Sequence, residues 1–180
     1  MRTFGTQAFG AKEKLMAYTN PAHTPSTGAV IPASWGTTVN ANMDVLQERA
    51  VGAEIFSAGV TVTTGDGKYY LPPMPTALNG YFLTGAIATV FAKSTSGTPT
   101  VQVARGRQAA AGTAHAFSDM FSTLLTVDAN EYCSLDATAA VVIDTTYDDI
   151  LTGDIIRIDV DVAGTGTTGL FVTLIFKAYL

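Results

Sequence analysis

The sequence predicts an all-β protein: a jelly-roll-like two-sheet β-sandwich that follows an extended N-terminal arm containing short helices. Three observations favour this fold. Segments with apolar residues at every second position recur from residue 56 to the C-terminus. Turn-forming residues separate these segments at intervals of about 8–12 residues, as in sandwiches and barrels. No helical pattern is long enough for the crossover of a parallel β-α-β unit. We therefore expect residues 1–55 to form the arm and residues 56–180 the sandwich domain.

The arm combines two short helix-forming segments with a long stretch of small and turn-forming residues. The helix formers are "AKEKLMAY" and "NMDVLQERA", the second with Asn42 placed to cap a helix N-terminus. Between them, "AYTNPAHTPSTGAVIPASWGTTVNAN" has no sustained periodicity and cannot bury enough apolar surface by itself. Aromatic residues in such a segment are typical anchors onto a protein partner, with docking onto the chain's own sandwich as the alternative. The expected anchors are Phe4, Phe9, Tyr18 and Trp35.

The first half of the sandwich domain contains four strand-like segments. In order, they cover residues 56–64, 68–71, 80–93 and 98–106. Pro72 and Pro73 end the second segment, because proline cannot donate to a strand ladder. "STSG" separates the third and fourth segments and predicts a hairpin between them. In the third segment, alternation places Leu83, Ile87 and Phe91 on one face. "RQAAAGTAHAFSD" then has the composition of a loop that crosses the domain.

The C-terminal half continues this pattern and contains an apparent nucleotide-binding motif. "MFSTLLTVD" and "AAVVID" are expected strands, and "TTYDDILTGD" is a polar crossing. Gly164, Gly166 and Gly169 have the G-x-G-x-x-G spacing of a phosphate loop, which needs a strand before it and a helix after it. The segment after the motif, "LFVTLIFKAYL", is β-branched and aromatic and predicts a strand. We therefore expect a hairpin with glycines at left-handed turn positions, and no bound nucleotide.

Composition narrows the classes of function. Hydrophobic residues make up 47% of the 180 residues and charged residues only 14%, as expected for a β-rich protein that covers part of its surface in an assembly. No apolar run approaches the roughly 18 residues of a membrane span, and the N-terminus lacks a secretory signal, so we expect no membrane partner. The net charge is −5, and the carboxylates concentrate after Arg107. That distribution argues against a nucleic-acid partner.

An acidic cluster is the strongest candidate for chemistry. It contains Asp144, Asp148, Asp149, Asp154, Asp159 and Asp161. Carboxylates bind calcium and, as close pairs, hydrolyse glycosides, but the spacing of a calcium-binding loop is absent. Asp159 and Asp161 alternate with apolar residues beside Arg157 and are expected on a solvated strand face. We expect no metal, no cofactor and no catalytic residue, hence no enzyme, with calcium near Asp148 and Asp154 left open.

The remaining candidate residues have ordinary structural interpretations. His23 and His115 lie in expected loops without a spaced ligand partner. Cys133 is the single cysteine; it excludes an intramolecular disulfide and is expected to be a buried, inert thiol. Arg105 and Arg107 stand two apart at a strand end, where a solvated rim is favoured over a partner-facing pair.

Two long segments carry a resemblance to known proteins. "NGYFLTGAIATVFAKSTSGTPTVQVARG" and the series from Met120 to Phe176 resemble jelly-roll virion proteins of tailed bacteriophages: capsid decoration (cement) proteins, head fibres and tail tips. "ILTGDIIRI" with its following strand is also similar to the closing hairpin of trimeric jelly rolls of the tumour necrosis factor and C1q type. The resemblance covers roughly residues 56–180.

The resemblance implies a structural role in the virion. It implies a decoration protein on the capsid surface, made in the host cytoplasm, that stabilises the shell by binding the major capsid protein through its arm and associates with itself as a homotrimer. The alternative is a head-fibre or tail-tip protein that binds host surface glycans. Sugar-binding loops usually present Trp or Tyr, and the loops "STSG", "AGTGTTG" and "TTGDG" have neither. This composition favours the decoration role.

Overall fold

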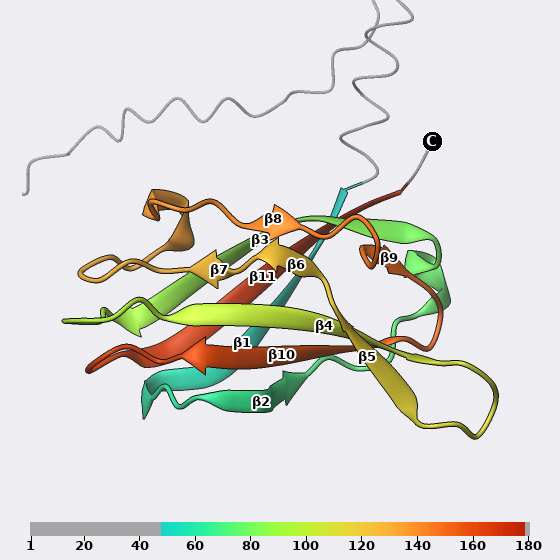
Figure 1. Ribbon diagram of the computed structural model, residues 1–180, viewed down its shortest axis with the longest axis horizontal. Helices are drawn as coiled ribbons and strands as arrows, with labels where there is room; N and C mark the ends of the chain where they lie inside the picture. The colour runs from blue at the N-terminus through green and yellow to red at the C-terminus, as the bar shows by residue number, and fades with distance from the viewer. Residues whose placement is uncertain (1–47, 179–180) are drawn as a thin grey trace, which may run out of the picture. The chain divides into compact units, whose positions relative to one another are not determined.

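The computed structural model describes residues 48–178, which form an all-β sandwich (Figure 1). The strands are β1 (Glu48–Thr61), β2 (Gly65–Tyr70), β3 (Tyr81–Ala92), β4 (Thr100–Gln108), β5 (His115–Asp119), β6 (Phe121–Thr123), β7 (Leu125–Thr126), β8 (Val142–Ile143), β9 (Asp149–Ile150), β10 (Ile155–Val162) and β11 (Thr168–Ala178). Two short 3-10 turns, η1 (Thr76–Leu78) and η2 (Ser134–Asp136), complete the described part. The predicted all-β sandwich is confirmed. The helix candidates before residue 48 lie outside the described residues.

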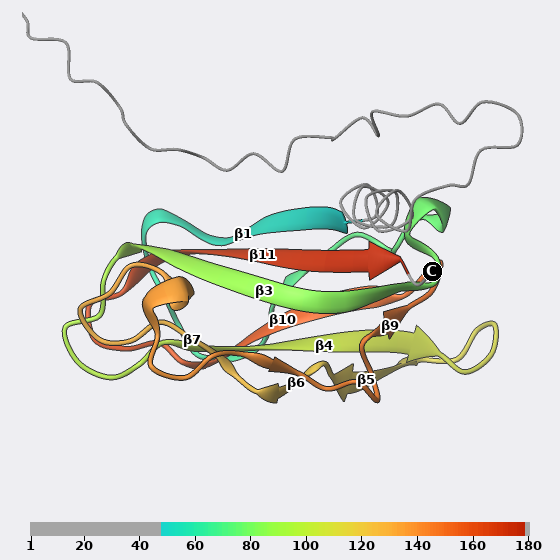
Figure 2. The same cartoon turned by 90° about the horizontal axis from the view of Figure 1, so that it is seen from above.

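Two antiparallel sheets face each other. The first sheet has the strand order β1-β11-β3-β9, and the second has the order β2-β10-β4-β5, with β7 also paired to β4. A small ladder joins β6 and β8. Figure 2 shows the two layers from the side, with β1, β11 and β3 in one layer and β4 and β5 in the other. Consecutive strands such as β1, β2 and β3 alternate between the sheets, so the connections cross from layer to layer.

The core fills the space between the sheets with aliphatic and aromatic side chains. The period-two alternation expected for β10 and β11 is confirmed, because alternate residues of both strands are buried. The large residues that are fully buried in the core include Leu83, Ile156, Ile158, Leu174 and Phe176. Burying one such side chain stabilises the fold by about 1.5–3 kcal/mol. This packing holds the two sheets together as a stiff body with two outer faces.

The expected hairpins are paired differently in the structure. β10 pairs with β2 and β4, whereas β11 pairs with β1 and β3. The glycine-rich loop between β10 and β11 therefore crosses between the sheets, and the expected closing hairpin is wrong. The "STSG" turn likewise connects β3 of the first sheet to β4 of the second. The segment expected as a crossing loop instead forms the hairpin of β4 and β5. A strand buries the same alternate residues whether its connection is a hairpin or a crossing, so periodicity does not distinguish them.

The start of β1 and a bulge in β3 also differ from expectation. β1 begins at Glu48, where Glu48 pairs with Lys177 of β11, so residues 48–50 are strand and the expected second helix does not extend through them. The sandwich therefore includes residues that the sequence assigned to the arm. In β3 the register shifts opposite Ile175 and Phe176. The shift turns Leu83 into the core, away from the outward-facing Ile87 and Phe91, because a bulge reverses the alternation of side chains.

Candidate functional site

One end of the sandwich holds a network of two arginines and two aspartates. Arg107 donates to Asp149 Oδ2 at 2.9 Å and to Asp154 Oδ2 at 2.6 Å. Arg105 forms an ion pair with Asp149 and donates to the Asp149 carbonyl oxygen at 2.8 Å. Arg105 is 8% exposed, so the expected solvated rim is wrong. The odd-numbered residues of β4 face the interior, and a buried guanidinium needs carboxylate partners.

The network ties the second sheet to the first. The hydrogen bonds that Arg107 donates to Asp154 and then to Asp149, together with the charges of both carboxylates, keep the pKa of Arg107 raised against the opposing effect of burial. Burial opposes ionisation of Asp149, but the hydrogen bond and charges of the two arginines outweigh it and lower the pKa of that carboxyl. The Leu151 N–H also donates to Asp154 Oδ2 at 2.8 Å. Each charge has a partner, so the arrangement acts as a crosslink between the layers.

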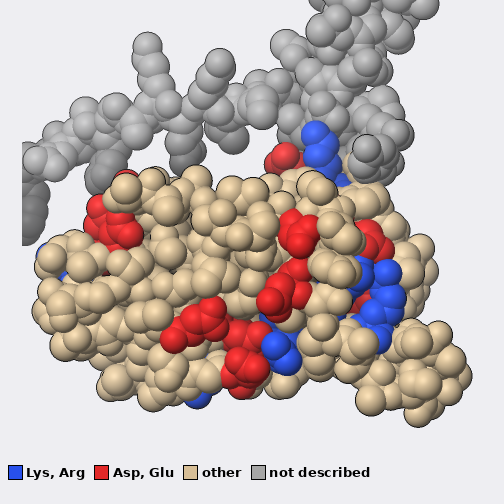
Figure 3. All heavy atoms as spheres, viewed as in Figure 1, with Lys and Arg blue, Asp and Glu red and all other residues tan. Residues whose placement is uncertain are grey.

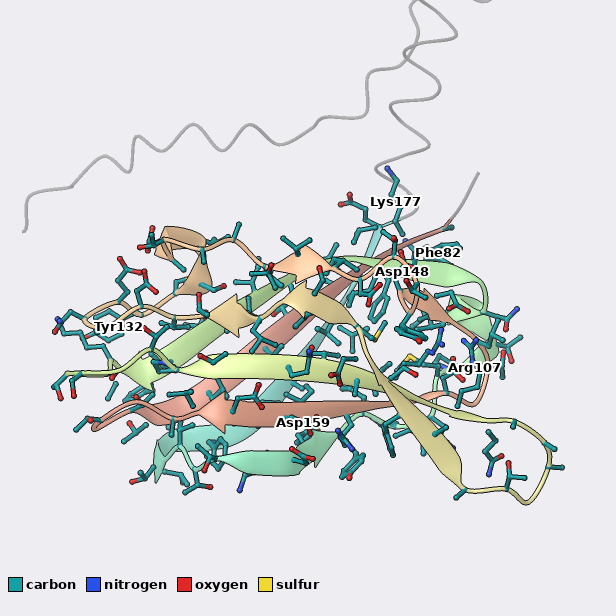
Figure 4. The ribbon with its side chains drawn as sticks, viewed as in Figure 1. Phe82, Arg107, Tyr132, Asp148, Asp159 and Lys177 are labelled. Atoms are coloured by element: carbon teal, nitrogen blue, oxygen red, sulfur yellow. The ribbon has the colours of Figure 1, made fainter. Side chains whose placement is uncertain are left out.

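An open cavity of about 270 Å³ lies beside this network. Its walls come from the end of β4, the loop that follows it, and the turn of residues 151–154. Arg107 and Asp154 are the charged residues in its wall, and they are bonded to each other. Figure 4 shows Arg107 at this end of the molecule, opposite the end that carries Tyr132. The cavity therefore presents a neutralised ion pair to a visiting molecule.

The outer face of the second sheet holds another buried carboxylate. Asp159 is 3% exposed and accepts hydrogen bonds from Arg157 Nη2 at 2.7 Å and from the Gly67 N–H at 2.6 Å. The expectation of a solvated Asp159 is therefore wrong, although Asp161 on the same strand is exposed. Partial burial of its carboxyl first, and then the negative charges of Asp159, Asp66 and Asp119, raise the pKa of Asp161. Figure 3 shows acidic side chains gathered on this face beside basic ones.

An aromatic pair lies on that same face. The ring centroids of Tyr70 in β2 and Phe117 in β5 are 6.3 Å apart, with the rings inclined at 64°. The Arg157 guanidinium carbon lies 4.5 Å from the centroid of Phe117. Tyr70 is 51% exposed and Phe117 is 37% exposed. Sequence reasoning missed this site because the two rings come from distant segments, one of which was expected to be a loop. We call Tyr70, Phe117 and Arg157 the aromatic platform.

The outer face of the first sheet has a contrasting chemistry. Apart from Glu48, Glu54 and Lys177, its outward positions on β1, β11 and β3 carry small, apolar or threonine side chains. We call them the uncharged face: Ala50, Gly52, Ile87, Thr89, Phe91, Phe171, Thr173 and Ile175. Phe91 is 64% exposed. The charged residues Glu48, Glu54 and Lys177 lie at the β1 edge or at one end of this face.

The structure separates the six expected acidic residues into different sites. Asp149 and Asp154 join the arginine network, with Asp148 adjacent, while Asp159 and Asp161 lie on the outer face of the second sheet. Asp144 follows β8 and accepts a hydrogen bond from the Thr146 N–H at 2.9 Å. Among residues 48–178, no three His, Cys, Asp or Glu side chains gather as metal ligands would. The calcium alternative thus finds no ligand cluster in that part of the chain.

The other expected residues have simple positions. Cys133 is partly exposed rather than buried, and Thr89 Oγ1 donates to its Sγ at 3.9 Å. His115 begins β5 instead of lying in a loop. The expected anchors Phe4, Phe9, Tyr18 and Trp35, together with His23, lie outside the described residues.

The glycine motif is followed by a strand, as expected. Gly164, Gly166 and Gly169 all have positive φ, at 71°, 77° and 61°, and β11 begins at Thr168. A phosphate loop needs a helix N-terminus at this point to supply free N–H groups. The glycines instead serve a tight crossing between the sheets.

Comparisons of the chain with protein-family models, with curated proteins and with solved structures return no match. No helix within residues 48–178 is long and apolar enough to cross a membrane.

Proposed function

We propose that the chain is a structural, non-enzymatic virion protein: a capsid decoration protein that binds and stabilises a bacteriophage shell. Its partners are the major capsid protein, bound through the N-terminal arm, and further copies of itself in a homotrimer. It is made in the host cytoplasm and resides on the capsid surface. The observation that carries the proposal is the uncharged face, because such a surface is suited to being covered in an assembly.

The composition of the uncharged face supports this role. Phe91 and Phe171 are 64% and 37% exposed on it, beside the partly exposed Ile87 and Ile175. Exposed apolar residues that gather on one face usually mark interaction sites on soluble proteins. The second sheet of the same molecule carries Arg157, Asp159 and Asp161 on its outer face. The difference between the two faces suits a body with one face covered by protein and the other exposed to solvent.

Multivalent attachment explains how such a body stabilises a shell. A stiff sandwich transmits force between neighbouring subunits without deforming, and many modest contacts add through effective concentration. In this account the arm supplies the contacts with the lattice, and its aromatic residues supply most of the binding free energy.

We test the role of the arm by mixing undecorated capsids with full-length protein and measuring occupancy after sedimentation. Trp35→Ala is expected to weaken attachment by about 2 kcal/mol per copy, because buried aromatic anchors dominate binding energies. The matched control is Tyr132→Ala, which removes a 53% exposed ring from the sandwich. Saturation of capsids by the Trp35→Ala protein at the wild-type concentration would show that the arm does not bind the capsid.

A further inference from the structure

The aromatic platform is built from strands that are not neighbours. The order β2-β10-β4-β5 places two strands between Tyr70 and Phe117, and strands are about 4.8 Å apart. The strand axes that carry the two rings are therefore roughly 14 Å apart. The ring centroids are nevertheless only 6.3 Å apart. Both side chains lean toward each other across the face, over Arg157 of β10 and the small residues of β4.

Glycines provide the space into which the rings lean. A Cβ on Gly106 would lie 2.6 Å from a ring carbon of Phe117, so only glycine at this position lets the ring lie over β4. A Cβ on Gly67 would lie 2.5 Å from the hydroxyl oxygen of Tyr70, so this glycine also leaves room for the ring. Packing on glycine supports both rings while leaving them 51% and 37% exposed. A preorganised, half-exposed aromatic pair gives up little entropy when it binds a ligand.

Polar groups of both kinds surround the rings. Arg157 is held by Asp159, through Nε at 3.0 Å and Nη2 at 2.7 Å. Asp66, Asp119 and Asp161 are exposed around it. Asp119 shares a cross-strand row with Ala104, which pairs in turn with Arg157, and Arg157 pairs with Tyr70. The face thus combines fixed aromatic surface with carboxylate acceptors and a guanidinium donor.

The pattern of charge limits the ligand class. Nucleic acids and anionic sugars are disfavoured, because their charges would meet several carboxylates around one arginine. A cationic side chain is disfavoured over Phe117, because the Arg157 guanidinium already occupies that position. A neutral sugar ring satisfies both constraints. Its C–H groups carry partial positive charge and pack on the negative face of an aromatic ring, and its hydroxyls both donate and accept.

We propose that the aromatic platform of Tyr70, Phe117 and Arg157, with the exposed carboxylates of Asp66, Asp119 and Asp161, is a binding site for a neutral carbohydrate. The sugar ring packs against Tyr70 and Phe117, its hydroxyls donate to the carboxylates, and Arg157 donates to a sugar oxygen. This site goes beyond the decoration role and does not depend on it, because it lies on the second sheet and involves neither the arm nor the uncharged face.

The test screens the full-length protein on an array of neutral oligosaccharides of glucose, galactose, mannose, rhamnose and N-acetylglucosamine. Any hit is then titrated by calorimetry. Tyr70→Ala is expected to weaken binding by about tenfold or more, because it removes half of the stacking surface. Tyr70→Phe keeps the ring and is expected to retain most of the affinity. Tyr132→Ala removes an exposed ring at the end of the sandwich opposite Arg107 (Figure 4) and is expected to bind like the wild type.

Thermal melting of each variant separates loss of the site from loss of the fold. Equal melting temperatures with selective loss of binding in Tyr70→Ala would support the site. The proposal is overturned if no neutral oligosaccharide binds, or if binding persists in Tyr70→Ala. Binding of an oligolysine peptide or a single-stranded RNA that depends on Tyr70 would also overturn it, since the platform would then recognise a charged ligand. None of these outcomes decides whether the protein decorates capsids.

Discussion

Asp154 and Asp159 are each only 3% exposed, and each is held by one arginine and at least one backbone N–H. Taking an ion out of water costs several kcal/mol unless a partner and hydrogen bonds compensate. The sequence indicates part of this arrangement, because Arg157 and Asp159 stand two apart on one strand and therefore share a face. It does not indicate the burial, since the residues that cover Asp159 come from other strands.

Asp148 gives a prediction on pH dependence. Burial and then the neighbouring charge of Asp149 raise its pKa, while Arg105 lowers it by less. A carboxyl with a raised pKa in the folded state contributes stability below its unfolded pKa and loses that contribution as pH rises through the folded value. Asp148→Asn does not titrate, so we expect it to melt at a higher temperature than the wild type at pH 7. The gain should shrink toward zero near pH 3.

The control is Asp136→Asn, at an exposed position in η2, which should not reproduce this pH-dependent gain. Melting curves recorded by circular dichroism from pH 3 to pH 7 provide the measurement. A lower melting temperature for Asp148→Asn at neutral pH would show that the carboxylate is stabilised by its surroundings.

At the scale of the element, the sequence predicts strands well and their partners poorly. The alternation in β10 and β11 correctly identifies two strands with one buried face each. Pairing depends on which sheet receives each strand, and a glycine-rich loop permits either a hairpin or a crossing. The short strands β6 to β9 have at most three residues, too few for a periodic signal. The aromatic platform could not be predicted for the same reason, because it requires the pairing of β5 with β4.

The crossing loop between β10 and β11 offers a prediction with an internal control. Gly164 and Gly166 both have positive φ, but they differ in the space around them. A Cβ on Gly164 would lie 2.5 Å from Ser94 Oγ, whose hydroxyl already donates to backbone carbonyls, whereas a Cβ on Gly166 meets nothing within 4 Å. Gly166→Ala is expected to cost about 1–2 kcal/mol from the left-handed backbone alone. Gly164→Ala is expected to cost about 1–3 kcal/mol in addition, because its methyl group would overpack against Ser94.

Urea denaturation of both variants measures these costs as changes in the free energy of unfolding. Equal costs would mean that Ser94 does not confine Gly164 and that the loop is looser than described. Neither substitution should change the response to NAD or ATP, because we expect neither nucleotide to raise the melting temperature of the wild type.

At the scale of the whole molecule, residues 48–178 form a stiff body with two unlike outer faces. One face carries small and apolar side chains over the middle of three strands, with Glu48, Glu54 and Lys177 at its margins. The other carries the Arg157–Asp159 pair and the aromatic platform. Composition anticipates this in part, because only 14% of the residues are charged and the apolar residues exceed what a small core needs. It does not reveal which face is uncharged, since that depends on the bulge in β3 and on the pairing of β11 with β1.

The copy number of this chain in purified virions tests the central claim most directly. A decoration protein covers the shell, so quantitative mass spectrometry against the major capsid protein should give a copy number of the same order as that protein. The chain should also be released when the arm variant Trp35→Ala replaces the wild type. A copy number that is a small fraction of the major capsid protein, as for a fibre or tail component, or the absence of the chain from virions, would contradict the account.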